Sequence, residues 1–590
     1  MPHIELVPDR KLLKTNFDGY ILSLEPVPVL TTDFTTTNRP HRVKPTEQQY
    51  SYYHARLFGM QNHLVRDPWA NGQCYYIDVT GMVQRVSYDT SLGRMRPLVA
   101  VFKLPLPASD ESEDDAIAIH RYNCSLVFPS EQLCLLSDGC GTVRVLETGD
   151  RTTGREWKLQ STFKPSEINL TEGVLPGGGV LLDGRFLVRD GKRTLHLVML
   201  QIDHQPVGKS KSLLHWFTLE QSASPVWTVS VSRTLQSDGY PRYCALDYHA
   251  TALLVACDEP FRFTHDSEHP VIVPEPQTLP TEGEEKPVWE QFPFRWTQTL
   301  EEVNITFDKH PDVQYRVLTE PSSPTNEPCL KVFANGVLVI DGTQLCSKVD
   351  HERTTWAMDR KTLEITLQKQ ITGVGWPFIV SGGPDETLPE ATDDRTELSD
   401  LPPATNLSAP LESCDFEGEQ ETYYTLERLS CINHTVTHTV SLGSGPPLFT
   451  VNLRPGLPPT FALRHDVDAC LWQLQPVAFG TEDCRFQHEG TLHAFGYVQA
   501  SKRQQKYLAC PPSMGYAVIS ESHRGIYLYR SSLGASGAGL RNRNGMQVAI
   551  GQHQFVSLKD SGEVLGISCE DEILMLLTEK GILALQIATG

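Results

Sequence analysis

The stretch "RHDVDACLW" contains residue types that perform acid–base catalysis: Arg464, His465, Asp466 and Asp468. A histidine held by a carboxylate activates the nucleophile of many hydrolases. On an extended strand, however, His465 and Asp466 point to opposite faces, and the sequence has no Gly-x-Ser-x-Gly nucleophile motif. We therefore interpret these residues as stabilising a turn at the edge of a sheet. No motif in the sequence supports a hydrolase, and we predict that the chain is not an enzyme.

A second candidate is the pair His434 and His438 in "HTVTH", because zinc uses this spacing on a helix. The alternation of Thr and Val predicts a strand, on which four residues span about 13 Å. One zinc ion with bonds of about 2 Å cannot bridge that distance. The 14 cysteines include no C-x-x-C pair, which is typical of reduced, buried thiols. We expect no metal and no cofactor.

The glycine-rich stretch "GASGAGLRNRNG" carries Arg541 and Arg543 and could be a phosphate-binding loop. It lacks the lysine of a P-loop, and Asn542 stands where the third glycine of a dinucleotide-binding loop belongs. We interpret it as a flexible loop between strands.

The segment "ASKRQQK" gathers Lys502, Arg503 and Lys506. A solvated loop and a contact for an acidic partner are both consistent with this cluster. The whole chain carries a net charge of −21, which disfavours direct binding to nucleic acid or to an anionic membrane. The N-terminal residues lack the apolar core of a signal peptide. Together with the dispersed cysteines, this leads us to expect a protein of the cytoplasm and nucleus.

Short apolar or alternating runs, broken by Gly, Pro, Asp and Ser, predict an all-β protein. One pattern recurs: an apolar run, a polar turn ending in glycine, and an alternating strand. It begins at Tyr75, Leu133, Tyr516 and Ile573, and we expect its glycine to supply a positive φ. Its glycines are 60 residues apart in the first pair and 56 in the second, and a period of roughly 40–60 residues with paired hairpins is typical of propeller blades. A set of unrelated hairpins in two sandwiches is the alternative.

Two segments interrupt this pattern and are predicted to be linkers. Residues 266–287 are rich in Pro and Glu, and residues 385–410 are strongly acidic. They enclose residues 288–384, which are enough for one small domain. We predict that residues 1–265 and 411–590 form one β-propeller of about seven blades, into which residues 288–384 are inserted. The strand "YILSLEPVPV" is expected to complete the last blade.

The enclosed segment has the signature of an antiparallel β-sandwich. In "VNITF", Val303 and its neighbours at every second position share one face, and Asn335-Gly336 is a strong hairpin signal. Trp376-Pro377 follows the last strand, where proline ends the ladder. The tryptophan either plugs the open end of the core or belongs to a Trp/Phe surface for protein docking.

"RWTQTLEEVNITF", "KVFANGVLVIDGTQL", "TTWAMDRKTLEITLQK" and the terminal Trp376-Pro377 resemble a CS domain of the NudC type. Stretches such as "FDGYILSLEPVPV" and "FGYVQASKRQQKYLAC" extend the resemblance to the NudC family over nearly the whole chain. The chain departs from the family after the Trp-Pro pair, where Phe378 replaces a polar residue. This departure affects any partner contact that depends on that polar residue.

The resemblance implies a non-enzymatic, co-chaperone-like adaptor. Its CS domain would dock a heat-shock chaperone or a β-propeller client, and its propeller would select other partners. The alternative is a stable scaffold subunit of a larger RNA-processing or transport assembly. The residues that we expect to bind protein are Trp296, Trp376, Pro377 and Phe378.

Overall fold

The structure is a computed structural model. It describes residues 2–106, 121–168, 177–203, 210–221, 225–271, 294–299, 301–308, 313–321, 328–341, 345, 349–358, 362–370, 376, 379, 423–443, 445–481, 483–502, 504–531, 541, 545 and 547–587. The chain divides into two compact units: unit 1 joins Met1–Val273 to Thr422–Gly590, and unit 2 is Pro274–Glu421. The predicted linker 385–410 and most of the linker 266–287 lie outside the described residues.

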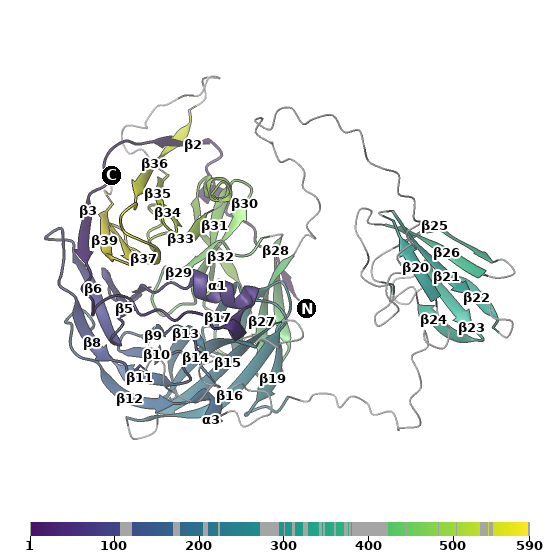
Figure 1. Cartoon of the computed structure of the whole chain (residues 1–590), viewed down its shortest axis with the longest axis horizontal. Helices are drawn as coiled ribbons and strands as arrows, with labels where there is room; N and C mark the ends of the chain where they lie inside the picture. The colour runs from purple at the N-terminus through teal and green to yellow at the C-terminus, as the bar shows by residue number, and fades with distance from the viewer. Residues whose placement is uncertain are drawn as a thin grey trace, which may run out of the picture. The chain divides into compact units, whose positions relative to one another are not determined.

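The fold is all-β, and the described residues of unit 1 form seven sheets of four or five strands (Figure 1). We number these sheets I to VII in the order of their central hairpins. Sheet I contains β4 (Val65–Arg66), β5 (Gln73–Ile77), β6 (Met82–Asp89), β7 (Arg94–Met95) and β8 (Val99–Lys103). Sheet II contains β9 (Ser125–Ser130), β10 (Leu133–Ser137), β11 (Val143–Glu147) and β12 (Lys158–Phe163).

Sheets III and IV are connected to the chain segments that lead to unit 2. Sheet III contains β13 (Val180–Arg189), β14 (Lys192–Asp203), β15 (Lys211–Gln221), β16 (Trp227–Ser237) and β19 (Arg262–Asp266). Sheet IV contains β17 (Tyr243–Leu246), β18 (Ala252–Cys257), β27 (Tyr424–Ser430), β28 (Val436–Gly443) and β1 (His3–Ile4). The chain therefore leaves unit 1 after an outer strand of sheet III and returns as a central strand of sheet IV.

The remaining three sheets of unit 1 follow the return of the chain. Sheet V contains β29 (Phe449–Val451), β30 (Thr460–His465), β31 (Asp468–Leu474) and β32 (Phe486–Leu492). Sheet VI contains β33 (Gln505–Ala509), β34 (Ala517–Glu521), β35 (Gly525–Arg530), β36 (Ala549–Ser557) and β2 (Phe17–Leu22). Sheet VII contains β37 (Val564–Cys569), β38 (Ile573–Thr578), β39 (Gly581–Gln586) and β3 (Val29–Asp33).

The four hairpins predicted from the glycine pattern are confirmed as β5–β6, β10–β11, β34–β35 and β38–β39. Gly81 and Gly141 have the expected positive φ, at +82° and +107°. For Gly525 and Gly581 this prediction was wrong, because neither has a positive φ. A Cβ on Gly525 would come within 2.3 Å of the Phe555 ring, and one on Gly581 within 2.6 Å of a backbone oxygen of β3. These two glycines provide space for a neighbouring strand.

An aspartate fixes the turn after the first hairpin strand in three of the sheets. The Oδ1 atoms of Asp78 and Asp138 accept the backbone N–H groups two and four residues further on, at 2.8–3.0 Å. In sheet IV, Asp247 accepts the N–H four residues further on, at 2.8 Å. Such side-chain to backbone bonds hold a tight turn in one conformation. A turn held by an aspartate side chain therefore recurs in sheets I, II and IV.

The N-terminal segment supplies the outer strands of three different sheets (Figure 1). β1 pairs in parallel with β28, β2 pairs in parallel with β36, and β3 pairs antiparallel with β39. The stretch 20–29 is therefore not one strand of the last sheet, as we expected from the sequence. Its first three residues belong to β2 in sheet VI, and Val29 starts β3. Pro26 and Pro28 separate the two strands, because proline cannot donate to a ladder.

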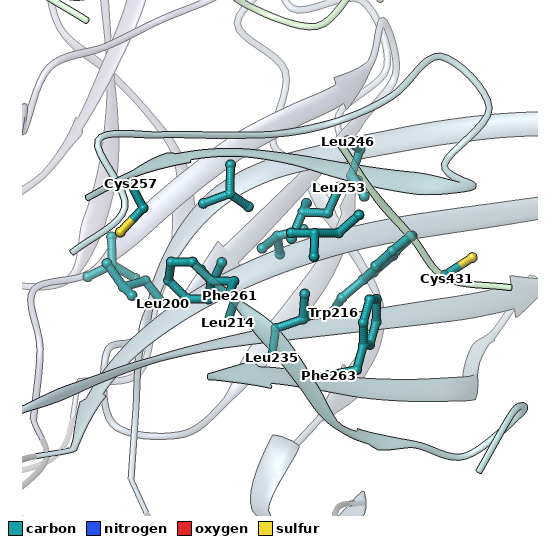
Figure 2. Packing of buried hydrophobic residues seen from close by; sticks show 14 of the residues in the cluster. Leu200, Leu214, Trp216, Leu235, Leu246, Leu253, Cys257, Phe261, Phe263 and Cys431 are labelled. Carbon is teal, nitrogen blue, oxygen red and sulfur yellow. The ribbon is translucent and has the colours of Figure 1, made fainter. Parts of the chain in front are cut away.

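Clusters of buried apolar side chains join the sheets of unit 1 in pairs. They lie between I and II, II and III, III and IV, IV and V, V and VI, VI and VII, and VII and I. Figure 2 shows the cluster in which Leu214 and Trp216 of sheet III pack near Leu246 and Leu253 of sheet IV. Each of the seven sheets thus shares a core with two others.

Helices are short in the described part of unit 1. They are α1 (Tyr52–Met60), α3 (Pro165–Ile168) and α5 (Phe495–Ala500), with 3-10 turns at Arg10–Leu12 and Glu47–Gln49. Leu57 of α1 is buried in the cluster between sheets III and IV. Of the helices in the described ranges, none is long and apolar enough to cross a membrane.

Unit 2 is a sandwich of two antiparallel sheets. One has the order β20 (Phe294–Gln298), β21 (Glu302–Asp308), β26 (Thr362–Lys369) and β25 (Val349–Met358). The other has the order β22 (Tyr315–Pro321), β23 (Pro328–Ala334) and β24 (Val337–Asp341). The predicted Asn335-Gly336 hairpin is confirmed between β23 and β24, with φ of +49° and +84°. The core of unit 2 contains Val303 and the apolar residues that alternate with polar ones along β21 and β26.

Candidate protein-binding site

Trp296 lies in β20 and is 1% exposed. In the strand pairing, Trp296 is opposite Ile305 of β21. Ile305 is opposite Ile365 of β26, and Ile365 is opposite Trp356 of β25. Residues that are directly opposite in a sheet point to the same face. The four side chains therefore form one row that begins in the core and ends at the outer strand of the sheet.

Trp376 is fixed in the same core by the amide of Gln298. The Gln298 Oε1 atom accepts the Trp376 N–H at 2.6 Å, and its Nε2 atom donates to the Trp376 carbonyl oxygen at 2.9 Å. The Lys369 ammonium donates to the same Oε1 atom and to the Thr299 carbonyl oxygen, both at 2.9 Å. Lys369 is 2% exposed and Trp376 is 3% exposed. A buried polar clamp thus holds the end of the domain.

The row has an exposed end at β25. Trp356 is 50% exposed and Met358, two residues further on, is 39% exposed. Met358 lies opposite Leu363, a core residue, so both exposed side chains are on the core-facing side of the sheet. We call Trp356 and Met358 the Trp356 edge. A half-exposed tryptophan beside a flexible thioether is a surface that suits protein binding.

Sequence reasoning and structure differ on which aromatic residues are accessible. Trp296 and Trp376 are both buried, and Pro377 and Phe378 lie outside the described residues. A binding role for these four residues stays a prediction. Sequence reasoning missed the Trp356 edge and also missed Gln298 and Lys369. The signal for the edge was present in "TTWAM", where Trp356 and Met358 occupy alternate positions of a strand.

Comparisons with known proteins agree with this architecture. The sequence model described as "CS domain" matches residues 292–369. NudC domain-containing protein 1 of Mus musculus is 30% identical over 617 residues, covering 98% of each chain. This chain belongs to the NudC domain-containing protein 1 family. The relative of the same name from Xenopus laevis is 28% identical with the same coverage. Nuclear migration protein nudC of Drosophila melanogaster is 31% identical over 109 residues, which are 18% of this chain and 32% of that protein.

The remaining candidate residues of this NudC family member form turns. Arg464 Nε donates to the Asp466 carbonyl oxygen at 2.9 Å, and Asp466 has a φ of +52° in the turn between β30 and β31. Asp468 accepts the Ala494 N–H at 2.7 Å and lies 3.9 Å from His493. Burial opposes the ionisation of Asp468, but these contacts outweigh it and lower the pKa of the carboxyl. His465 is exposed.

The two histidines with zinc spacing lie in different elements. His434 is in the turn before β28 with a φ of +55°, and His438 is inside β28. The His434 Nε2 atom lies 3.0 Å from the Asp266 carboxylate, which also accepts from Arg233 at 2.9 Å. In the described ranges, no three His, Cys, Asp or Glu side chains gather as a metal ion requires.

The basic cluster is divided by burial. The Lys506 ammonium is buried and donates to Glu563 and to the Val564 carbonyl oxygen, both at 2.8 Å. Burial lowers the pKa of Lys506 and Glu563 opposes that effect. Lys502 is half-buried and its ammonium lies 4.4 Å from the centre of the Tyr527 ring. Arg503 and most of the glycine-rich stretch, including Arg543, lie outside the described residues.

Proposed function

We propose that the protein is a non-enzymatic adaptor of the NudC family in which a CS domain is inserted into a closed seven-bladed β-propeller. The family and the CS domain suggest a co-chaperone-like, protein-binding role. The propeller is supported by the apolar clusters of unit 1. They join seven sheets in a series whose last member, sheet VII, shares a core with sheet I. A ring is the arrangement in which every sheet has two neighbours and no sheet face stays open.

The observation that carries the binding role is the Trp356 edge. Unit 2 has an apolar core of its own, and Trp356 and Met358 do not belong to the cluster that forms it. Exposing half of a tryptophan to water is unfavourable by roughly 1 kcal/mol or more, estimated from its apolar area. A partner that covers this edge recovers that free energy. We propose that the CS domain docks a heat-shock chaperone or a β-propeller client through this edge, in the cytoplasm and nucleus.

Affinity purification tests this proposal. The full chain, the chain without residues 288–384 and the full chain with Trp356→Ser are tagged, and their partners are compared by quantitative mass spectrometry. We expect a chaperone or propeller protein that is bound by the full chain and reduced about tenfold in both other samples. Val337→Ser is the matched control, because Val337 is 41% exposed on the other sheet of unit 2. Partners that remain unchanged in all samples would contradict the CS-docking role and favour the scaffold alternative.

A holdase assay provides the second measurement. The fragment 288–384 contains the complete described core of unit 2, so it can be tested alone. We expect it to suppress the heat-induced aggregation of a β-propeller client, and we expect Trp356→Ser to remove most of this effect. Suppression by the variant at the level of the unmodified fragment would rule out the Trp356 edge as the client site.

A further inference from the structure

The outer strand of sheet VI exposes apolar side chains along a free edge. β2 pairs with β36 on one side, and no described strand pairs with its other side (Figure 1). Ile21 is 49% exposed, Leu22 57% and Leu24 88%. Outer strands of soluble proteins are usually protected by charges, prolines or covering segments, because a free edge attracts another strand. β2 carries one exposed charge, Asp18, and ends in two exposed aliphatic residues, Ile21 and Leu22, while Leu24 follows two residues after the strand.

β2 is held firmly against its sheet. The Tyr20 ring packs 5.0 Å from the Tyr529 ring, and the Tyr20 hydroxyl donates to the His493 carbonyl oxygen. Tyr20 lies opposite Gly551, where a Cβ would approach the tyrosine ring to 2.6 Å. The Ser23 N–H continues the ladder to His553. A fixed edge loses little conformational entropy when a further strand is added.

Aromatic side chains extend the apolar surface across the neighbouring strands. Leu22 is opposite His553, and the strand pairing places Phe555 and Tyr527 on the same face of the sheet. The Phe555 and Tyr527 rings are 5.0 Å apart, and Phe555 is 46% exposed. Leu22, Phe555 and Tyr527 together form what we call the β2 face.

Two cations border the β2 face. The Lys502 ammonium lies above the Tyr527 ring, and the exposed Arg524 directly precedes Gly525, the first residue of β35, which contains Tyr527. Neither forms an ion pair with a carboxylate in the described part of the chain, within 4.0 Å. The carboxylate of Glu521 also acts on the Tyr527 hydroxyl, but it is buried, so the more accessible charges at this border are those of the two cations. The carboxylates of Asp18 and Glu25 are exposed at the two ends of the apolar run, so an acidic group is favoured only on the Lys502 side.

We propose that β2 binds an extended, acidic segment of a partner protein, which adds to sheet VI as a further strand. The backbone of the segment pairs with the free edge of β2, its apolar side chains cover Leu22, and the charges of Lys502 and Arg524, which lie beyond β36, attract its carboxylates from a distance. This inference gives a location to the partner selection that the resemblance to the NudC family implies for the propeller, and it rests on that expectation. It does not depend on the CS domain.

Selection from a phage-displayed library of random peptides of about 12 residues tests the proposal. The full chain is the target, and the Leu22→Ser, Lys502→Glu double variant is used for counter-selection. We expect enriched peptides that alternate apolar and acidic residues. In fluorescence anisotropy, a synthesised peptide of this kind should lose about tenfold in affinity with Leu22→Ser and again with Lys502→Glu. High salt should weaken binding to the unmodified chain more than to Lys502→Glu.

Matched controls come from β12, the outer strand of sheet II. Leu159 is 53% exposed and Lys158 is exposed, so Leu159→Ser and Lys158→Glu change the same residue types on another outer strand. These controls should leave the affinity unchanged. Circular dichroism melting establishes that all variants are folded. The proposal is overturned if no peptide is enriched, if the enriched peptides are basic, or if they bind the β2 variants as well as the unmodified chain. Repeating the measurement without residues 288–384 separates this outcome from a failure of CS docking.

Discussion

At the scale of residues, the most consequential group is the amide of Gln298. It fixes the backbone of Trp376 on both sides and also receives the buried Lys369 ammonium. A buried cation is costly unless its donors are satisfied. Gln298 therefore links the first strand of the CS domain to the residues that follow its last strand.

We predict that Gln298→Ala lowers the free energy of unfolding of the 288–384 fragment by about 2–4 kcal/mol, because it leaves Lys369 short of an acceptor. Urea denaturation followed by tryptophan fluorescence measures this change. Gln368→Ala is the control, since the half-buried Gln368 amide also donates to a backbone carbonyl, but this hydrogen bond is exposed to solvent. The Gln368→Ala change should lower the free energy of unfolding by less than about 0.5 kcal/mol. Equal losses for the two variants would contradict the role of the buried clamp.

Three histidines of unit 1 predict a pH dependence: His196 and His215 are buried, and His63 is half-buried. Burial lowers the pKa of His63 and His196 to about 3 and that of His215 to about 4. Below the ordinary histidine pKa of about 6.5, the unfolded chain binds protons that the folded chain excludes. These residues therefore destabilise unit 1 as the pH falls below that value, by up to about 1.4 kcal/mol per histidine and pH unit.

His215→Gln should make the free energy of unfolding less dependent on pH, by about the contribution of one histidine. The protein should stay folded, since glutamine can still form hydrogen bonds to Gln201 and Thr234. Urea denaturation of the full chain at about pH 7, 6 and 5 measures the effect. The exposed His465→Gln should leave the slope unchanged. If His215→Gln leaves the slope as steep as in the unmodified chain, His215 takes up a proton in the folded protein.

The residues explain which parts of the site were predictable. Alternation along "VNITF" and the Asn335-Gly336 pair were sufficient for the CS sandwich, because strand periodicity and turn chemistry are local. The burial of Trp296 and Trp376 depends on strands that are distant in sequence. Whether the row starting at Trp296 ends in the core or in solvent depends on how far the second sheet extends over β25. Sequence pattern does not contain that information.

At the scale of elements, the close approach of neighbouring strands explains why glycine occupies two hairpin positions that have no positive φ. Gly581 lies where β39 meets β3, and its missing side chain allows the backbones to approach. We predict that Gly581→Ala costs about 1–3 kcal/mol, because the added methyl separates these strands. Thermal denaturation of the full chain measures it. Gly445→Ala is the control, with nothing within 4 Å of the added Cβ and no positive φ. If Gly581→Ala lowers the stability less than Gly445→Ala does, β3 can shift to make room for the added methyl group.

The hairpins could be predicted from sequence, but the assignment of outer strands could not. A hairpin pairs residues that a short turn connects, so the local pattern defines both strands. β1, β2 and β3 pair with strands more than 400 residues away, judged from their registers. Sequence patterns place no constraint on such pairings, and the division of 20–29 between two sheets followed only from the structure.

At the scale of the whole molecule, unit 1 is one body built from two chain segments. We predict that replacing residues 272–422 by a Gly/Ser linker of about 12 residues leaves unit 1 folded, with a melting temperature within about 5 °C of the full chain. Calorimetry measures this, and expression of residues 1–271 alone should yield an unfolded or aggregated product. A folded, monomeric 1–271 fragment would mean that the two segments are separate domains.

The pairing of β3 with β39 also has a consequence for synthesis. The ribosome releases the C-terminal strands last, at about 5–20 residues per second. β3 must therefore wait, unpaired, until β39 has been made, and β1 and β2 must wait for β28 and β36. During that interval β1, β2 and β3 have no partner strand, so the nascent chain carries unpaired strand edges. A protein that we expect to assist the folding of others would itself depend on protection while it is being made.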